Sequence, residues 1–457
     1  MLLWSLSRFP DLSLTWSLLQ ASSAAGQRPD GLSLSGPFMA CQQRGLHPEG
    51  ASLLLEHLAP RGGAMASAAV VAAAALFAEI GDAARALDVV EAAARKGLAN
   101  GVSEQVWVAC GGALGALPPL RTWSVEFGEP YAKELRLLQH VLETAQRGDV
   151  ESVCAAVESF GEATLPGTRH WLKVAGGPKA EVLTEVVRRA PVGGVAVEVG
   201  TYCGYSSALF AAARAARGSR GGGSAPSVAT VEVDLVHAIV ARNVLMFAGA
   251  AHLVETLVGH SEDVLPWLAE RMQEKSLVPC VDFAFLDQRG SRYAADLAAL
   301  ERRGCLKAGA IVLADNVLKP GAPLFLWRVS RAGGGFETEV RSLSEFAMSG
   351  VEDWMTISTY RPDELAEGPV PEPPRSVRAL EWKAEQMRAR AHQPDYGGSG
   401  IGFSEWATFA EEMRHELQSI GLAQDVQTLD GKPRSEGHDS QRQSPHHHTL
   451  RDGRWQP

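Results

Sequence analysis

The pattern of apolar and polar positions divides the chain into three parts that differ in hydrophobic spacing and composition. Residues 1–125 carry Ala, Leu and Glu at helical spacing, interrupted by Gly and Pro. Residues 126–362 alternate short β-branched runs with amphipathic segments, and residues 363–457 are rich in polar residues and open with a run of Pro and Glu. The pattern predicts an all-helical N-terminal domain, a central α/β domain, and a linker followed by a disordered tail.

In the N-terminal part we expect helical segments at residues 51–58 and 67–96. The phrase GDAARALDVVEAAARKGLAN resembles the second helix of pentatricopeptide-type repeats, but the glycine and proline breaks are irregularly spaced. A repeat array and a plain helical bundle that binds a protein partner both fit. The apolar stretch at residues 1–19 fits a first helix better than a targeting signal, because Arg8 and Pro10 interrupt it.

The central part predicts a doubly wound, mostly parallel sheet of seven strands, of the Rossmann-like kind. Helices are expected at residues 133–146, 150–160 and 179–189, ahead of the first strand. The strands themselves are expected at residues 195–199, 228–233, 254–258, 281–286, 310–314, 336–340 and 355–360.

The first strand runs into a glycine turn and a helix, VAVEVGTYCGYSS, with Gly200 and Gly204 four residues apart. Such a turn presents backbone N–H groups to a ligand at the carboxyl edge of the sheet. The third glycine of a dinucleotide fingerprint and the Lys of a P-loop are missing. Glu198 at the strand end suits a cationic ligand such as S-adenosylmethionine, although an ordinary turn of another α/β domain remains open.

Polar side chains follow five of the predicted strands. Glu232 is placed to accept hydrogen bonds from a ribose diol. Two carboxylates and an amide oxygen form a hard-oxygen set that suits Mg²⁺ or Ca²⁺ better than zinc. The residues at these strand ends are Glu198, Glu232, Ser261, Asp287, Asp315 and Asn316.

Composition limits the remaining choices. The formal net charge of −10 makes a nucleic-acid partner improbable, and the six scattered cysteines predict reduced thiols in a cytoplasmic protein. The longest apolar run, residues 65–78, is too short for a membrane span. In the tail, an amphipathic helix is expected at residues 404–420, disorder is expected from residue 425, and His446–His448 lack metal-site spacing.

Residues 127–360 resemble catechol O-methyltransferase nearly end to end. The matching phrases are LLQHVLETAQRGDVESV, VEVGTYCGYSS, ATVEVD, VGHSEDVLP, VDFAFLDQRGSRY, GCLKAGAIVLADNVLKPGAP and SGVED, in family order. The resemblance implies an S-adenosylmethionine-dependent methyltransferase fold ending in a reversed hairpin. It also implies Mg²⁺ and an in-line displacement in which a catecholate oxygen attacks the sulfonium methyl.

The resemblance also implies roles for individual residues. The metal would be held by Asp287, Asp315 and Asn316, and catalysis would involve Asp287, Asn316 and Glu352, the last holding the second catechol hydroxyl. The acceptor pocket would be lined by Trp171, Lys173, Arg289, Pro320 and Glu352. The cofactor would be bound by Ala175, Glu198, Gly200, Tyr202, Ser206, Glu232, Val233, Ser261, Glu262 and Asp287.

Four positions depart from the family pattern. Gly290 stands where the family has its general-base lysine, Arg289 replaces an aromatic gate, Gln288 replaces a histidine, and Lys173 replaces a methionine. A missing base typically costs about 10²–10⁴-fold in rate. We hypothesise that Lys319 or Lys173 supplies the missing charge. The sequence therefore favours an O-methyltransferase, and the alternative is a degenerate cofactor-binding domain fused to a protein- or RNA-binding helical module.

Overall fold

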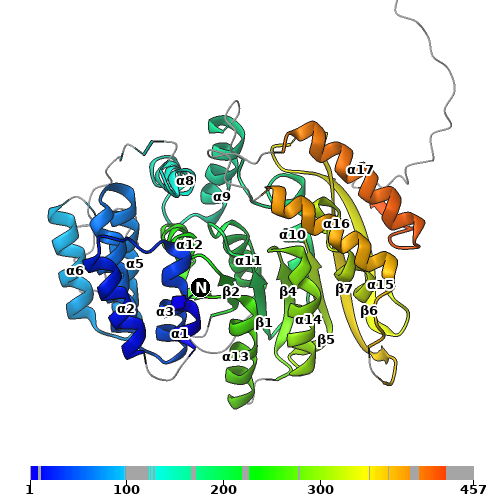
Figure 1. Ribbon diagram of the computed structural model, residues 1–457, viewed down its shortest axis with the longest axis horizontal. Helices are drawn as coiled ribbons and strands as arrows, with labels where there is room; N and C mark the ends of the chain where they lie inside the picture. The colour runs from blue at the N-terminus through cyan, green and yellow to red at the C-terminus, as the bar shows by residue number, and fades with distance from the viewer. Residues whose placement is uncertain are drawn as a thin grey trace, which may run out of the picture.

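The structure is a computed structural model, and its central feature is one eight-stranded sheet with helices on both faces (Figure 1). The residues it describes are 2–8, 12–96, 98, 123, 125–126, 129–165, 171–218, 226–275, 278–348, 350–368, 370–391 and 401–428. The end of the first helical region, Cys110 and the histidine tract lie outside these residues.

The strand order is β3-β2-β1-β4-β5-β7-β6-β8. The first five strands are parallel, whereas β7 is antiparallel to both β5 and β6, which confirms the reversed hairpin. The bounds are β1 Val195–Val199, β2 Val228–Glu232, β3 Val254–Val258, β4 Val281–Leu286, β5 Leu306–Ala314, β6 Gly334–Ser344, β7 Glu352–Leu365 and β8 Val426–Thr428.

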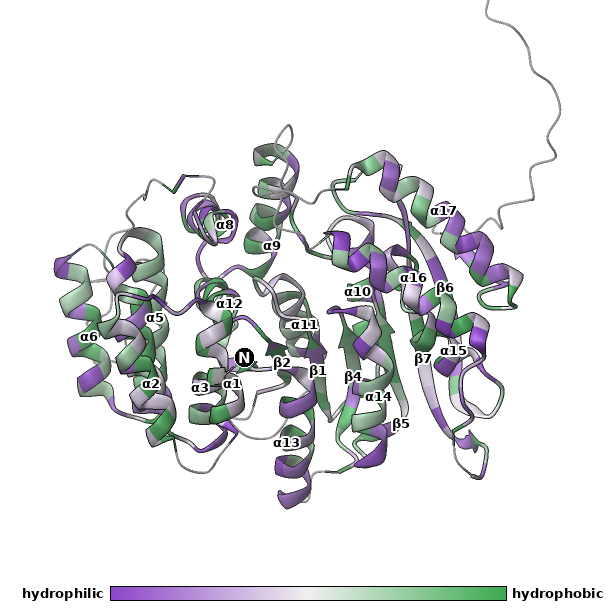
Figure 2. Ribbon diagram, viewed as in Figure 1, coloured by the Kyte–Doolittle hydropathy of each residue, from purple (hydrophilic) through white to green (hydrophobic). Residues whose placement is uncertain are grey.

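Helices cover both faces of the sheet (Figure 2). Successive residues of the central strands are mostly apolar, so each face of the sheet needs an apolar cover. The helices of one face are α8 Ala132–Thr144, α9 Val150–Ser159, α10 Pro178–Arg189, α11 Tyr205–Ala216 and α12 Leu235–Phe247. Those of the other face are α13 Ser261–Glu274, α14 Tyr293–Arg302 and α15 Pro323–Ser330.

The N-terminal helices share a hydrophobic core with the sheet region. They are α1 Leu2–Ser7, α2 Ser13–Ala24, α3 Gly31–Gln43, α4 His47–Leu53, α5 Gly63–Glu79 and α6 Ala83–Arg95. A π-helical turn, Leu54–Leu58, extends α4 and completes the expected segment at residues 51–58. The expected segment at residues 67–96 is two helices, because Gly81, with φ of 75°, ends α5.

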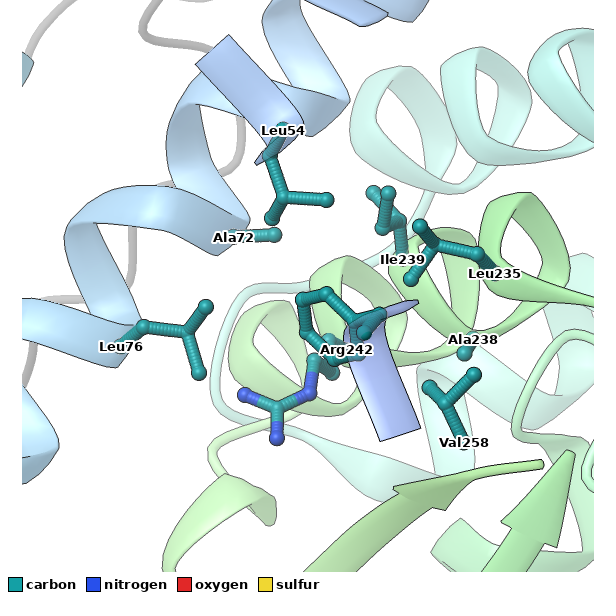
Figure 3. A pocket seen from close by; sticks show the side chains of 9 residues that line it. Leu54, Ala72, Leu76, Leu235, Ala238, Ile239, Arg242 and Val258 are labelled. Atoms are coloured by element: carbon teal, nitrogen blue, oxygen red, sulfur yellow. The ribbon is translucent and has the colours of Figure 1, made fainter. Parts of the chain in front are cut away.

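Helix α3 covers the edge of the sheet at β3. The Gln42 side chain donates to the Thr256 carbonyl at 3.0 Å and accepts from the Val258 N–H at 2.8 Å, which satisfies edge groups that another strand would otherwise pair. Figure 3 shows the neighbouring seam, where Leu54, Ala72 and Leu76 face α12 across a small, mainly apolar pocket. None of the described helices has both the length and the hydrophobicity that crossing a membrane requires.

The C-terminal part differs most from expectation. The predicted linker contains a helix, α16 Arg375–Ala391, and the tail adds β8 beside β6, giving eight strands where seven were predicted. The expected amphipathic helix is α17 Phe403–Ser419, and its apolar face is buried against the molecule. Cys41, Cys154, Cys203, Cys280 and Cys305 are free and buried in the structure.

Candidate functional site

The glycine turn after β1 is fixed by close backbone approach. A Cβ on Gly200, where φ is 110°, would lie 2.0 Å from the carbonyl oxygen of Asp287. Gly204 precedes α11 with φ of 84°, and Tyr202 between them also has a positive φ of 46°. The turn therefore brings the end of β1 against the end of β4, and only glycine fits at position 200.

Glu198 is fully buried beneath this turn. Its carboxylate accepts hydrogen bonds from Ser206 at 2.5 Å, from Thr230 at 2.6 Å, and from Ser207. Burial raises the pKa of Glu198 to about 7, and the three hydroxyl donors oppose that rise. A buried carboxylate held in one position at a glycine turn is a suitable partner for a cationic group.

Glu232 at the end of β2 is held by the backbone. It accepts from the Tyr202 N–H at 2.8 Å and from the Asp234 N–H at 2.9 Å, and His237 Nδ1 lies 3.7 Å away. The Tyr202 hydroxyl donates to Glu134 at 2.7 Å. The carboxylate of Glu232 therefore has a fixed direction next to the glycine turn.

Two further residues expected to bind the cofactor, Ser261 and Glu262, lie at the start of α13. Gln288 donates to Ser261 at 2.9 Å, which joins the end of β4 to the start of α13. Glu262 is half-exposed and forms ion pairs with Arg8 at 3.4 Å and Arg292 at 3.1 Å. Ala175 is buried and Val233 is half-buried, the latter directly after Glu232.

A second group of charges lies at the ends of β4 and β5. Lys179 on α10 is fully buried, and its Nζ lies 2.8 Å from Asp315, 2.8 Å from Asp353 and 3.1 Å from Glu345. Lys319 Nζ lies 2.7 Å from the other oxygen of Glu345. We call Asp287, Asp315, Glu345, Asp353, Lys179 and Lys319 the acidic cluster.

Asn316 is oriented by the same carboxylates. Its φ of 54° is a left-handed conformation that Asn tolerates, and its side-chain nitrogen donates to Asp353 at 2.7 Å. Because the amide nitrogen donates to Asp353, the amide oxygen points away from that carboxylate. It is therefore free to coordinate a cation.

The acidic cluster has an excess of negative charge. Four carboxylates face two ammonium groups, so the fully ionised cluster carries a net charge of −2. Burial, and next the charge of Asp315, raise the pKa of Asp287, while burial raises the pKa of Asp315 to about 6 against the effect of Lys179. Lys179 and Lys319 overcome burial at Glu345 and lower its pKa to about 2.

One divalent cation would balance this charge. Across the described residues, no three His, Cys, Asp or Glu side chains converge to hold a metal ion by themselves. A cation here would therefore need the Asn316 amide beside Asp287 and Asp315, with further oxygens from water or a ligand. The donor set and its charge fit Mg²⁺, and they do not fit zinc.

The structure separates Glu352 from this cluster, which corrects the role expected for it. Adjacent residues of a strand point to opposite faces, and Asp353 is the one that faces Lys179. Glu352 accepts from Ser342 at 2.6 Å and from the Trp354 indole at 3.0 Å on the other face. Glu345, at the end of β6, brings a carboxylate to the cluster instead.

The expected acceptor-wall residues lie in different surroundings. Pro320 follows a cis peptide bond after Lys319, beside the cluster, and Trp171 is half-buried with its carbonyl accepting from Lys133 at 3.0 Å. Lys173 is exposed, and Lys133, Glu134 and Glu232 are its charged neighbours. Of the two lysines proposed to supply charge, only Lys319 is therefore placed in the acidic cluster.

Arg289 and Gly290 both contact α16. The Arg289 side chain is 55% exposed and forms an ion pair with Glu385. A Cβ on Gly290 would lie 2.7 Å from Nη2 of Arg388 and 2.7 Å from the Gly321 carbonyl oxygen. Arg388, which is buried, donates to that carbonyl and to Glu385 at 2.9 Å. The space next to Gly290 is therefore filled by a side chain from the predicted linker.

Sequence reasoning missed four charged residues of this region. Lys179 begins an amphipathic helix and resembles an ordinary solvent-facing residue, and Arg388 lies in a segment interpreted as a linker. Glu345 and Asp353 flank a hairpin whose register the sequence leaves open. The sequence does show Glu345 and Asp353 as two carboxylates near the last predicted strand. Only the sheet order, in which β7 pairs with β5, shows that they lie beside Asp315.

The sequence of the chain is similar to those of known methyltransferases. Residues 197–317 match a family model described as a methyltransferase domain. The chain is 36% identical to catechol O-methyltransferase of Bos taurus over 210 residues, covering 45% of this chain and 69% of the relative. It is 34% identical to the Mus musculus protein of that name over 209 residues, covering 45% and 70%. The transmembrane O-methyltransferase of Homo sapiens is 36% identical over 202 residues, covering 44% and 63%.

Proposed function

Because the chain belongs to the catechol O-methyltransferase family, we propose that it methylates a hydroxyl of a catechol-type acceptor with the help of Mg²⁺. The family makes it an S-adenosylmethionine-dependent O-methyltransferase-like enzyme. The observation that supports the finer proposal most is the acidic cluster. Its four carboxylates outnumber its two ammonium groups, and it lies at the ends of β4 and β5, next to the turn where Gly200 touches the backbone of Asp287.

Glu198 and Glu232 would hold the cofactor on one side of that turn. The carboxylate of Glu198 supports the turn and would face the ammonium group, and the carboxylate of Glu232 would accept hydrogen bonds from the ribose hydroxyls. Ser261, near Gln288, would lie towards the adenine. Held in this way, the cofactor would be positioned relative to the acidic cluster, and positioning of this kind supplies a large part of the rate in such transfers.

Asp287, Asp315 and Asn316 would hold Mg²⁺, which when bound lowers the pKa of an acceptor hydroxyl. Glu345 takes the place expected for Glu352, and its carboxylate would accept a hydrogen bond from the second hydroxyl of the catechol. Lys319, 2.7 Å from Glu345, stabilises negative charge on the acceptor in the absence of a lysine at Gly290.

Methyl transfer from labelled S-adenosylmethionine to a simple catechol, with Mg²⁺ and with excess EDTA, tests the proposal. We expect product only with the metal. Lys319→Ala should lower kcat by about 10²-fold or more, whereas Lys173→Ala should change it less than about threefold. Cofactor binding without transfer to any catechol would instead favour the degenerate cofactor-binding domain.

Two substitutions distinguish the roles of the two glutamates of the hairpin, Glu345 and Glu352. Glu345→Gln should raise the KM for the catechol, and Glu352→Gln should leave it unchanged because Glu352 faces Trp354 and Ser342. The reverse pattern would restore Glu352 to the role that the resemblance gave it. Calorimetric binding of S-adenosylhomocysteine should be equal in both variants, which controls for folding.

A further inference from the structure

Two helices beyond the family resemblance lie against the proposed acceptor side. Helix α17 packs on the segment Val317–Gly321, which carries Lys319 and Pro320, and α16 packs on the same segment. Figure 1 shows α16 and α17 in orange next to β6 and β7. Because the Arg388 guanidinium donates to the Gly321 carbonyl and to two glutamates of its own helix, α16 is anchored to this segment.

Trp406 on α17 is the residue of this pair that reaches the acidic cluster. The Lys319 ammonium lies over the Trp406 ring, with Nζ 5.1 Å from the ring centroid. The Phe409 ring packs edge-on against Trp406, with 6.1 Å between the two ring centroids. Lys319 in turn bonds Glu345. The indole is therefore one side chain away from the carboxylates that would receive the acceptor.

The indole nitrogen of Trp406 is buried without a partner. The residue is only 4% exposed, and within the described part of the chain no acceptor lies within hydrogen-bonding distance of its Nε1. A buried Trp N–H nearly always finds a partner, since leaving one unpaired is costly. An acceptor oxygen that enters beside Lys319 and displaces the atoms now covering Nε1 would provide that partner.

We infer that Trp406 is a specificity-determining residue, whose indole N–H donates to an oxygen substituent of the aromatic acceptor. This inference rests on the proposed function. The oxygen is a neutral one, a carbonyl or hydroxyl, because the other cations nearby are already paired: Arg289 with Glu385, and Arg388 with Glu381. The excess of negative charge in the cluster also disfavours a carboxylate at this place.

The test compares an acceptor that carries a carbonyl, 3,4-dihydroxybenzaldehyde, with unsubstituted catechol. Trp406→Phe keeps the ring over Lys319 and removes only the N–H. We expect the KM for the aldehyde to rise roughly tenfold, with kcat and the KM for catechol unchanged, since one hydrogen bond is lost. Trp382→Phe is the matched control, because Trp382 on α16 is 66% exposed.

A binding measurement separates this inference from the proposed function. Calorimetry with S-adenosylhomocysteine and Mg²⁺ present reports the affinity of each acceptor without turnover. If the aldehyde binds but is not methylated, and Trp406→Phe weakens it about tenfold, Trp406 keeps its role and the transferase proposal fails. If both acceptors are methylated and Trp406→Phe affects neither or both equally, Trp406 is a packing residue. Failure of both acceptors to bind overturns both proposals.

Discussion

Placing a lysine at position 290, where the family has its base, should damage this protein. A Cβ at Gly290 would lie 2.7 Å from Arg388 Nη2, 2.7 Å from the Gly321 carbonyl oxygen and 3.1 Å from Ala322 Cβ. The guanidinium could move, but the carbonyl belongs to the backbone that also positions Lys319. Overpacking of this kind costs about 1–3 kcal/mol, so we expect Gly290→Ala to lower the free energy of unfolding by that amount. Gly290→Lys should lower it more.

Urea denaturation of the full chain measures the effect, followed by circular dichroism. Gly402→Ala is the matched control, because a Cβ there meets nothing within 4 Å. Since Gly402 is the N-cap of α17, where Ala is less favourable than Gly, we expect a loss of at most about 1 kcal/mol. Gly290→Ala should cost less in an Arg388→Ala background than in the wild type, as a double-mutant cycle shows for two groups in contact. If Gly290→Lys is as stable as the wild type and faster in methyl transfer, α16 does not fill this space in solution.

Two further predictions concern buried charges. Lys179→Met leaves Asp315, Glu345 and Asp353 without their shared ammonium, so we expect a loss of about 3–5 kcal/mol in urea denaturation, against less than about 1 kcal/mol for Lys383→Met at a half-exposed pair. An equal, small effect of both would contradict the buried cluster. The raised pKa of Glu198, about 7, stabilises the cofactor-free fold fully below pH 4.5, and this contribution is lost as the pH rises through 7. Glu198→Gln should flatten that part of the stability–pH curve, and an unchanged slope would assign it to another group.

The sheet was largely predictable because its strands are apolar runs that end at polar residues. Glu198, Glu232, Asp287 and Asp315 all lie at the carboxyl edge, as alternation of strands and helices requires. The arrangement of the hairpin was harder to predict from the sequence. Glu345 and Glu352 are both acidic and seven residues apart, and only the pairing of Ser344 with Glu352 shows which of them leaves the strand towards Lys179.

The C-terminal helices show a second limit. Helix α16 follows a run of prolines and is rich in Arg and Glu, so its sequence predicts a solvated segment. Its order comes from tertiary contacts, chiefly the Arg388 guanidinium beside Gly290 and the Gly321 carbonyl. The helix carries an apolar stripe, Val377, Leu380, Ala384 and Met387, but an arginine and a glutamate share its buried face, and the prolines before it indicate a linker.

Gly290 and Arg388 explain each other, which changes the meaning of the missing lysine. Read alone, a glycine at the position of a catalytic base suggests decay. In the structure, however, the glycine is required, because any side chain would displace the arginine that anchors α16. The same helix pair brings Trp406 over Lys319, so the absence of a cation at position 290 accompanies an added covering on the proposed acceptor side. The departure from the family is therefore better explained by a rebuilt acceptor site than by a disabled one.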